Sequence, residues 1–353
     1  MTDRLRHGSF CTGYGGLDIA TQNVYGGDLA WACDIDPGAA QIIAHRMPHA
    51  PNLGDLTATD WQAVIEKHGP VDIVTGGYPC QPFSVAGQRK GTADERHIWP
   101  HIANALRVLR PRIAIFENVA GHLRLGFDTV LADLARLGFD AQWCLVRASE
   151  IGAPHHRQRL FILATAQNPD STTRDQRRLA APRQAESRGT RPDTGGRGGT
   201  PSAHARSAGL EIRPVEPHGP ELAAAQRGRG EPAADAPSVG HGHPGPTSLG
   251  GMAAPAVASG PSRDWGQFTP ATARWERATG RLAPGAVDDR GRLSPAFVEW
   301  LMGLDAGWVT QVPGLTRNQQ LKALGNGVVP QQAAAAIRLL HQRAIADELR
   351  AAA

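Results

Sequence analysis

The chain has few cysteines, few lysines and no long apolar run. Its 353 residues include four cysteines that are widely spaced and form no Cys-x-x-Cys pair, a pattern that argues against a zinc ribbon or a disulfide framework. The opening residues, MTDRLRHGS, contain no apolar signal-peptide core, and no segment has the unbroken apolar length needed to cross a bilayer. We therefore expect a soluble cytoplasmic protein with no membrane contact and no metal site.

Positive charge comes mainly from arginine, because Lys67, Lys90 and Lys322 are the only lysines. The formal net charge of +4 permits a polyanionic partner without requiring one. Arginine suits contacts with phosphates and base edges. A GC-rich coding sequence nevertheless accounts for most of this bias, so composition alone does not identify a partner.

The first part of the chain, residues 1–166, alternates strand-like and helix-like segments. The apolar runs LAWAC, VDIVT, RIAIF and RLFILA resemble buried strands, and helices are expected at 37–46, 98–109 and 127–137. This alternation predicts an α/β fold with a doubly wound, mostly parallel sheet. Ligands of such sheets bind outside the carboxyl ends of the strands, so we look for chemistry in the loops that follow strands.

The composition changes sharply at residues 167–262, which are rich in Gly, Pro, Arg, Ala and Ser. That composition favours a flexible segment over a compact domain. Apolar anchors return at Trp265, Phe268 and Trp275. From residue 292 helices are expected again, one with Ser294 as N-cap and Pro295 at its first position, and a last amphipathic helix from Pro330.

A glycine loop and two acids follow strands in the first part. GSFCTGYGGLDIA places Gly13, Gly15 and Gly16 between a strand and a helix, where the backbone can approach a ligand, although a structural turn explains the glycines equally well. The spacing is neither the dinucleotide fingerprint nor a P-loop. Asp34 follows the second strand, a place where an acid commonly binds a ribose diol. Asp55, in LGDLT, follows a candidate third strand and fits the adenine edge of a nucleoside cofactor.

Cys80 lies between Pro79 and Pro82 in GGYPCQPFS. Prolines fix φ and reduce loop entropy, which suits a nucleophile, although a lone cysteine is more often a small buried hydrophobe. The other cysteines lie in or beside apolar runs and are interpreted as buried hydrophobes. Glu117 ends the strand RIAIF, where burial would raise its pKa and let it donate a proton at neutral pH. A capping or paired acid is the alternative.

Arg157 and Arg159 alternate in PHHRQR at the entry to a strand. Alternate residues of a strand share one face, and two arginines aimed at a cleft suit an anion, a carbonyl oxygen or a phosphate. An exposed edge with paired charges is the alternative.

Taken together, these motifs resemble the DNA (cytosine-5)-methyltransferases of bacteria and phages, which use S-adenosyl-L-methionine. The resemblance rests on FCTGYGGLD, DID, GDL, GGYPCQPFS, ENV, HHRQR, RLSPAFVEWLMG and ALGNGVVPQQ, in the family's order. PCQPFS together with ENV is highly specific, whereas the glycine motif alone is not. The resemblance implies a Rossmann-like methyltransferase fold in which residues 1–166 and 292–353 form the catalytic domain. A smaller, variable target-recognition region, 167–291, is inserted between them.

The resemblance also implies the role of each residue. Cys80 attacks C6 of a flipped cytosine, Glu117 holds and protonates N3, Arg159 supports the O2 side and Arg157 organises the pocket. The addition makes C5 an enamine-like carbon that accepts the methyl group. The positions implied for the cofactor are Gly13, Gly16, Asp34, Asp55, Pro79, Ile98 and Asn326. The loop after Cys80 is expected to be a mobile lid, with phosphate contacts from Arg89, Lys90 and Arg96.

Three positions depart from the family pattern. Cys11 replaces the aromatic residue that often stacks on adenine, while Phe10 lies one place earlier. His155 replaces the glutamine that usually begins the arginine motif, and Asp34 replaces the commoner glutamate at the ribose position. No departure removes a catalytic group, so we expect activity.

The implied partner is double-stranded DNA, together with a cognate restriction endonuclease if the protein serves restriction–modification, and we expect a monomer. Three alternatives stay open. An RNA cytosine-5 methyltransferase would keep the chemistry on the same scaffold. A DNA-binding relative without catalysis is disfavoured by the intact Cys80, Glu117 and Arg159. A hydrolase with a Cys80 nucleophile and a histidine base, His155 or His156, leaves the cofactor motifs unexplained.

Overall fold

The computed structural model describes residues 4–79, 98–167 and 264–352, which belong to one compact unit. Of the predicted flexible segment 167–262, only Gln167 is described. Four predicted site residues lie outside the described ranges: Cys80, Arg89, Lys90 and Arg96. The predictions for them, and for a lid in that loop, stay predictions.

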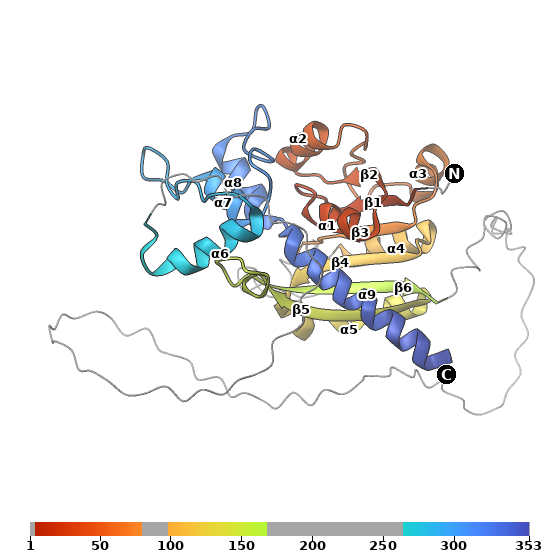
Figure 1. Cartoon of the computed structure of the whole chain (residues 1–353). Coiled ribbons are helices and arrows are strands. Elements are labelled where there is room, and N and C mark those ends of the chain that lie inside the picture. Colours follow the sequence, from red (N-terminus) through yellow and green to blue (C-terminus); the bar gives the residue numbers. More distant parts are fainter. Residues whose placement is uncertain (1–3, 80–97, 168–263, 353) are drawn as a thin grey trace, which may run out of the picture. The chain divides into compact units, whose positions relative to one another are not determined.

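A six-stranded sheet in the order β2-β1-β3-β4-β6-β5 forms the centre of this unit (Figure 1). The strands are β1 (Arg6–Phe10), β2 (Asp28–Cys33), β3 (Ile73–Gly76), β4 (Ile113–Val119), β5 (Phe139–Arg147) and β6 (Gln158–Ala166). The first four pair in parallel, and β6 pairs antiparallel with both β4 and β5. Among the described strands β6 alone therefore runs the other way, which confirms the predicted mostly parallel sheet.

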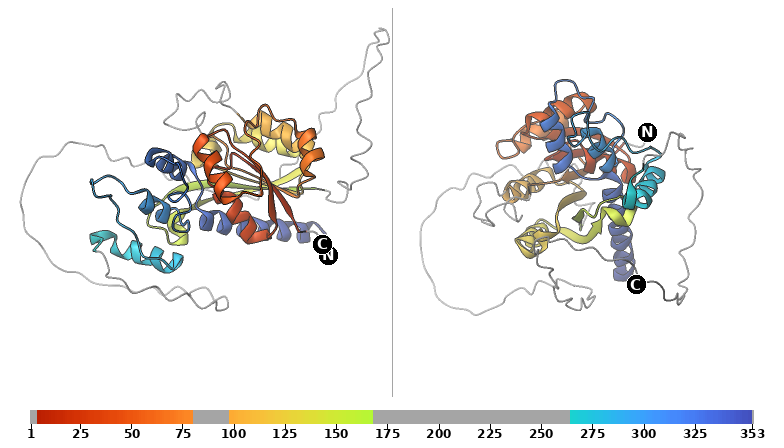
Figure 2. Two further views of the ribbon diagram at one scale, coloured as in Figure 1. Left: turned by 90° about the horizontal axis from the view of Figure 1, so that it is seen from above. Right: turned by 90° about the vertical axis from the view of Figure 1, so that its left-hand side faces the viewer.

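Helices cover both faces of the sheet, so the doubly wound prediction is also confirmed. One face carries α3 (Trp61–His68), α4 (Trp99–Leu109) and α5 (Phe127–Arg136), and the other carries α1 (Gly16–Tyr25) and α9 (Pro330–Ala352). Side chains of a strand alternate between faces, so in β4 Phe116 packs with the first group and Ile115 with the second. The C-terminal α9 consequently lies beside the first helix (Figure 2).

Local sequence signals set several helix boundaries. Asp36 caps α2 (Pro37–Arg46) by accepting hydrogen bonds from the N–H groups of Gly38 and Ala39. The hydroxyl of Ser294 accepts from the N–H of Phe297 at the start of α7 (Pro295–Leu301). The Ser294 cap, the range of α2 and the start of α9 at Pro330 confirm the predictions. The ranges predicted for α4 and α5 differ from the observed ones by one residue.

The candidate third strand before Asp55 is not present. Asn52 makes only an isolated bridge to Ala32. Pro51 has no N–H to donate, and Gly54 has φ +75°, so an extended strand cannot continue through this loop. Asp55 is therefore a loop residue. Conversely, β5 was not predicted, because its partly exposed side chains do not form a continuous apolar run.

The described C-terminal part begins with short helices that pack around tryptophans. These are η7 (Gly266–Phe268), α6 (Thr269–Thr279), α7 and α8 (Arg317–Asn326), and two further short helices, η3 (Ala120–Arg124) and η4 (Ala148–Ile151), follow β4 and β5. Trp275 is fully buried in one cluster with Trp300 and Tyr14. The α6 segment, predicted to belong to the recognition region, thus shares a core with the catalytic part. No described helix is both long and apolar enough to span a membrane.

Candidate active site

A cavity of about 810 Å³ opens at the carboxyl ends of the parallel strands. Its lining includes residues from the ends of β1, β2, β3 and β4 and from the C-terminal end of α8. All seven predicted cofactor positions lie in its wall: Gly13, Gly16, Asp34, Asp55, Pro79, Ile98 and Asn326. Glu117 and Arg159 line it as well. The sheet topology thus brings residues that are far apart in the sequence together in one cavity wall.

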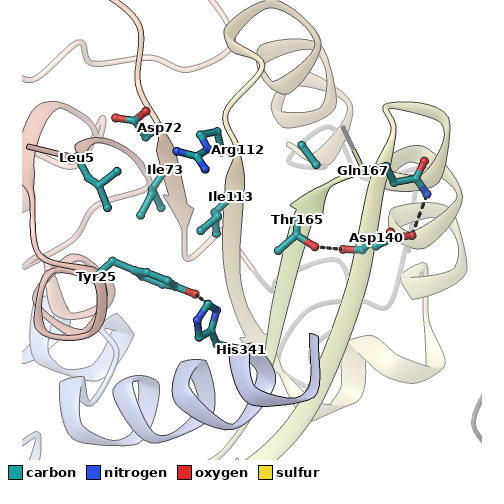
Figure 3. A pocket seen from close by; sticks show the side chains of 11 residues that line it. Leu5, Tyr25, Asp72, Ile73, Arg112, Ile113, Asp140, Thr165, Gln167 and His341 are labelled. Carbon is teal, nitrogen blue, oxygen red and sulfur yellow. Dashed lines mark hydrogen bonds between the residues drawn. The ribbon is translucent and has the colours of Figure 1, made fainter. Parts of the chain in front are cut away.

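A second cavity, of about 520 Å³, lies at the opposite edge of the sheet (Figure 3). Asp72 and Arg112 line it just before β3 and β4 begin. The hydroxyl of Tyr25 and Nδ1 of His341 face each other there at 3.3 Å. No predicted site residue lines this cavity. Because parallel sheets bind ligands at the carboxyl ends of their strands, we place the functional site in the larger cavity.

The glycine loop needs its glycines for different reasons. Gly13 and Gly15 have φ +57° and +81°, a left-handed conformation that favours glycine. A Cβ on Gly16 would lie 2.2 Å from the carbonyl oxygen of Val328, whereas one on Gly13 would meet no atom within 4 Å. Gly16 therefore serves close packing, while Gly13 leaves the backbone open to the cavity. Cys11, also left-handed at φ +50°, has a thiol whose pKa is raised by burial.

The two acids of the DID motif, Asp34 and Asp36, have different partners. Asp34 accepts hydrogen bonds from the N–H groups of Gly13 and Asp36, at 2.8 and 2.9 Å, and burial raises its pKa. Asp36 caps α2 and pairs with Lys322, and that hydrogen bond lowers its pKa. Asp34 therefore belongs to the cavity and the glycine loop, whereas Asp36 also has a structural role as a helix cap.

Glu117 lies buried at the end of β4 and forms an ion pair with Arg159, with Oε1 and Nε 2.8 Å apart. The antiparallel pairing of β4 and β6 brings them together, because Val119 lies opposite Arg159. Burial raises the pKa of Glu117, and the charges of Arg159 and Arg157 act against that rise. A Cβ on Gly77 would lie 3.7 Å from Oε2, so the carboxyl group faces the chain just before Cys80.

The two arginines of the PHHRQR motif have different partners. Arg157 has φ +31° and precedes β6. It is therefore not part of the strand in which alternate residues share one face, and the prediction that it shares a face with Arg159 does not apply. Its guanidinium donates to the carbonyl oxygens of Gly325, at 3.1 Å, and Gly327. Arg157 thus holds the backbone on both sides of Asn326. This contact agrees with an organising role, and Arg157 is near enough to Glu117 for its charge to act on the pKa of that carboxyl group.

Sequence reasoning missed two buried groups around the glycine loop. The hydroxyl of Tyr14 donates to the carbonyl oxygen of Val328 at 2.7 Å, and a Cβ on Gly327 would lie 1.8 Å from the Tyr14 ring. Asp18 lies in the first turn of α1 and is 2% exposed. A carboxyl group inside the otherwise apolar start of that helix, GLDIA, is the signal that could have identified it.

His155 makes a hydrogen bond to the backbone of the C-terminal part. Its Nε2 lies 2.9 Å from the carbonyl oxygen of Leu301. A carbonyl accepts a hydrogen bond, so Nε2 must carry the proton. Burial lowers the pKa of His155. These contacts make it a structural residue and weaken the hydrolase alternative.

Comparison with known proteins identifies relatives of the first half of the chain. The family model described as C-5 cytosine-specific DNA methylase matches residues 5–196. The Type II methyltransferase M.AquIA of a Picosynechococcus strain is 30% identical over 46% of this chain and 75% of its own length. The DNA N-6-adenine-methyltransferase of Escherichia phage P1 is 35% identical, over 37% of this chain and 19% of its own. The chain spans only 19% to 36% of the first three curated relatives.

The fold is also that of a solved methyltransferase. The structure of EhMeth from Entamoeba histolytica aligns over 97% of this chain and 99% of its own, with a TM-score of 0.53 and 14% identity. At that identity the likeness concerns the fold alone. The family model covers more than half of the chain, and its range includes both the glycine loop and the Glu117–Arg159 pair. This chain belongs to the C-5 cytosine-specific DNA methylase family.

Proposed function

We propose that the protein transfers a methyl group from S-adenosyl-L-methionine to C5 of a cytosine in double-stranded DNA. The observation that carries the proposal is the buried Glu117–Arg159 pair in the wall of the glycine-loop cavity. Pro79, in the same wall, leads directly into Cys80. Glu117 and the residue that precedes Cys80 thus line a cavity that also suits a nucleoside cofactor.

The residues of the cavity fit S-adenosyl-L-methionine. Asp34 offers a carboxylate for a ribose diol, and the open backbone at Gly13 gives a ligand close approach. Ile98 and Ile35, the latter 74% exposed, give apolar surface for a base. The cavity of about 810 Å³ lies within the usual range for cofactor sites. When bound, the cofactor supplies an electrophilic methyl group.

In the proposed mechanism, Glu117 and Cys80 activate the cytosine together. With its raised pKa, Glu117 can hold a proton toward N3, and Arg159 fixes the carboxyl group. The proton at N3 withdraws electrons from the ring, so the Cys80 sulfur can add to C6 and leave C5 as a nucleophilic enamine carbon. After C5 has been methylated, loss of its proton and departure of the Cys80 sulfur restore the aromatic ring.

The substrate base must leave the helix to reach such a cavity, because stacking covers the ring faces from which C6 and C5 must be approached and base pairing occupies N3. We assign the phosphate contacts to Arg89, Lys90 and Arg96 on sequence grounds. A monomeric protein, a cytoplasmic location and a cognate restriction endonuclease complete the proposal. The endonuclease is inferred from relatives that are named Type II methyltransferases.

The test is to incubate the purified full chain with tritium-labelled S-adenosyl-L-methionine and unmethylated genomic DNA, with RNA in a parallel tube. The labelled nucleosides are then separated, and 5-methylcytosine is mapped by bisulfite sequencing. We expect 5-methylcytosine in one short recurring context. Label in N6-methyladenine alone, in RNA alone or in no nucleic acid would overturn the proposal. Cys80→Ser should abolish transfer, while the matched variant Cys144→Ser, at a buried cysteine outside the cavity wall, should keep it.

A further inference from the structure

Asp18 is a buried carboxyl group whose partners are hydroxyls. Its two carboxylate oxygens accept hydrogen bonds from Ser9, at 3.0 Å, and from Thr75, at 2.6 Å. Thr12 donates in turn to the Ser9 hydroxyl at 3.0 Å. In the described part of the chain no lysine, arginine or histidine forms an ion pair with Asp18. Burial raises its pKa to about 6, so at neutral pH the group is mostly a charged carboxylate with no counter-ion among the described side chains.

The strand order fixes the place of this charge in the cavity wall. Asp34, assigned to the ribose, follows β2 on one side, and Glu117, assigned to the cytosine, lies near the end of β4 on the other. The hydrogen-bond partners of Asp18 lie between them, Ser9 on β1 and Thr75 on β3. Neighbouring strands are about 4.8 Å apart, so Asp18 lies between the ends where the nucleoside and the target base are placed. The methyl donor group has to lie in that interval.

A buried carboxylate without a cation is unfavourable, and a cationic ligand placed near it would offset that cost. The sulfonium of S-adenosyl-L-methionine is such a cation, whereas the sulfur of the product S-adenosylhomocysteine is neutral. On the basis of the proposed function, we infer that Asp18 is a specificity-determining residue whose charge favours the sulfonium cofactor over its neutral product. The simpler interpretation is that Asp18 only ties α1 to β1 and β3, and it predicts no preference between the two ligands.

Calorimetric titration of the full chain separates these interpretations. The ligands are S-adenosyl-L-methionine, S-adenosylhomocysteine and sinefungin, which carries a protonated amine near the sulfonium position. In Asp18→Asn, the preference for the two cationic ligands over S-adenosylhomocysteine should fall on the order of tenfold. The matched variant Asp34→Asn removes another partly buried cavity carboxylate and should weaken all three ligands by a similar factor. An Asp18→Asn protein that binds all three with the wild-type ratios would overturn the inference.

The same titration identifies which proposal has failed. If the wild-type protein binds none of the three ligands, the proposed function itself is wrong. If Asp18→Asn does not fold, the wild-type ratios are compared at about pH 5 and about pH 7.5, because protonation then neutralises Asp18 without a substitution. Asp34 and Glu117 are the other cavity carboxyls with raised pKa values, Arg159 and Lys322 are its cations, and His101 also lines it. Repeating the comparison in Asp34→Asn and in Glu117→Gln removes each of these acids in turn. If the ratio of the affinities for the cationic ligands and for S-adenosylhomocysteine is the same at both pH values, the inference is overturned.

Discussion

Removing the Tyr14 hydroxyl tests whether the contact between the glycine loop and the C-terminal part stabilises the protein and its cofactor site. The ring is fully buried, and the hydroxyl donates to the carbonyl oxygen of Val328 at 2.7 Å. Tyr14→Phe keeps the ring that packs against Gly327 and loses only this hydrogen bond. Loss of a buried, well-formed hydrogen bond should lower the free energy of unfolding by about 1–2 kcal/mol. Binding of S-adenosyl-L-methionine should weaken as well, because Val328 also packs on Gly16.

The assay is urea unfolding followed by tryptophan fluorescence, with calorimetric titration of the cofactor. Tyr25→Phe is the matched control, because the Tyr25 hydroxyl lies 3.3 Å from His341 in the other cavity and is only partly buried. We expect that control to lose less than about 1 kcal/mol and to bind the cofactor like the wild type. Equal losses of stability in the two variants, or unchanged cofactor binding in Tyr14→Phe, would refute the reasoning.

Three further predictions concern buried acids. Glu117→Gln should lower methyl transfer to DNA by about 100-fold or more, while the calorimetric affinity for S-adenosyl-L-methionine stays near the wild-type value. The pKa of Asp18 rises from 3.8 to about 6 on folding, so the folded state binds more protons between these values and loses stability as the pH rises through them. Asp18→Asn removes this loss, so its unfolding free energy relative to the wild type should rise by about 2 kcal/mol from about pH 4 to about pH 7. Urea unfolding across that range measures the rise. Glu299 accepts hydrogen bonds from the N–H groups of Gly307, Val309 and Thr310, so Glu299→Ala should destabilise the fold by about 3 kcal/mol in the same assay.

Much of the fold could be predicted because its signals are local. The apolar runs that became β2, β3, β4 and β6 are short and nearly continuous, and the N-caps Asp36 and Ser294 mark helices within a few residues. The exception among the strands is β5, in which Trp143 and Leu145 are about 40% exposed. Their burial depends on neighbouring elements and not on the pattern of the segment itself.

The candidate site could be predicted as a set of residues but not as a set of contacts. Motif order placed Gly13, Asp34 and Glu117 at strand ends, and strand ends meet at one edge of a parallel sheet. The partners of Arg157 could not be read in that way, because a left-handed backbone turns it toward Gly325 and Gly327, which lie far along the chain. The link between Tyr14 and Val328 was missed for the same reason, since no local periodicity connects them.

The position of α9 has a consequence for the chain while it is being synthesised. Ile73, Ile115 and Phe161 pack against this helix on one face of the sheet, yet the ribosome makes α9 last among the described elements. When the nascent chain has emerged only as far as β6, the apolar side chains that α9 will cover on this face of the sheet are therefore still exposed. Such faces promote aggregation and are bound by chaperones. Synthesis of α8, whose C-terminal end lines the larger cavity, and of α9, rather than completion of the glycine loop, is thus the step that allows that cavity to form.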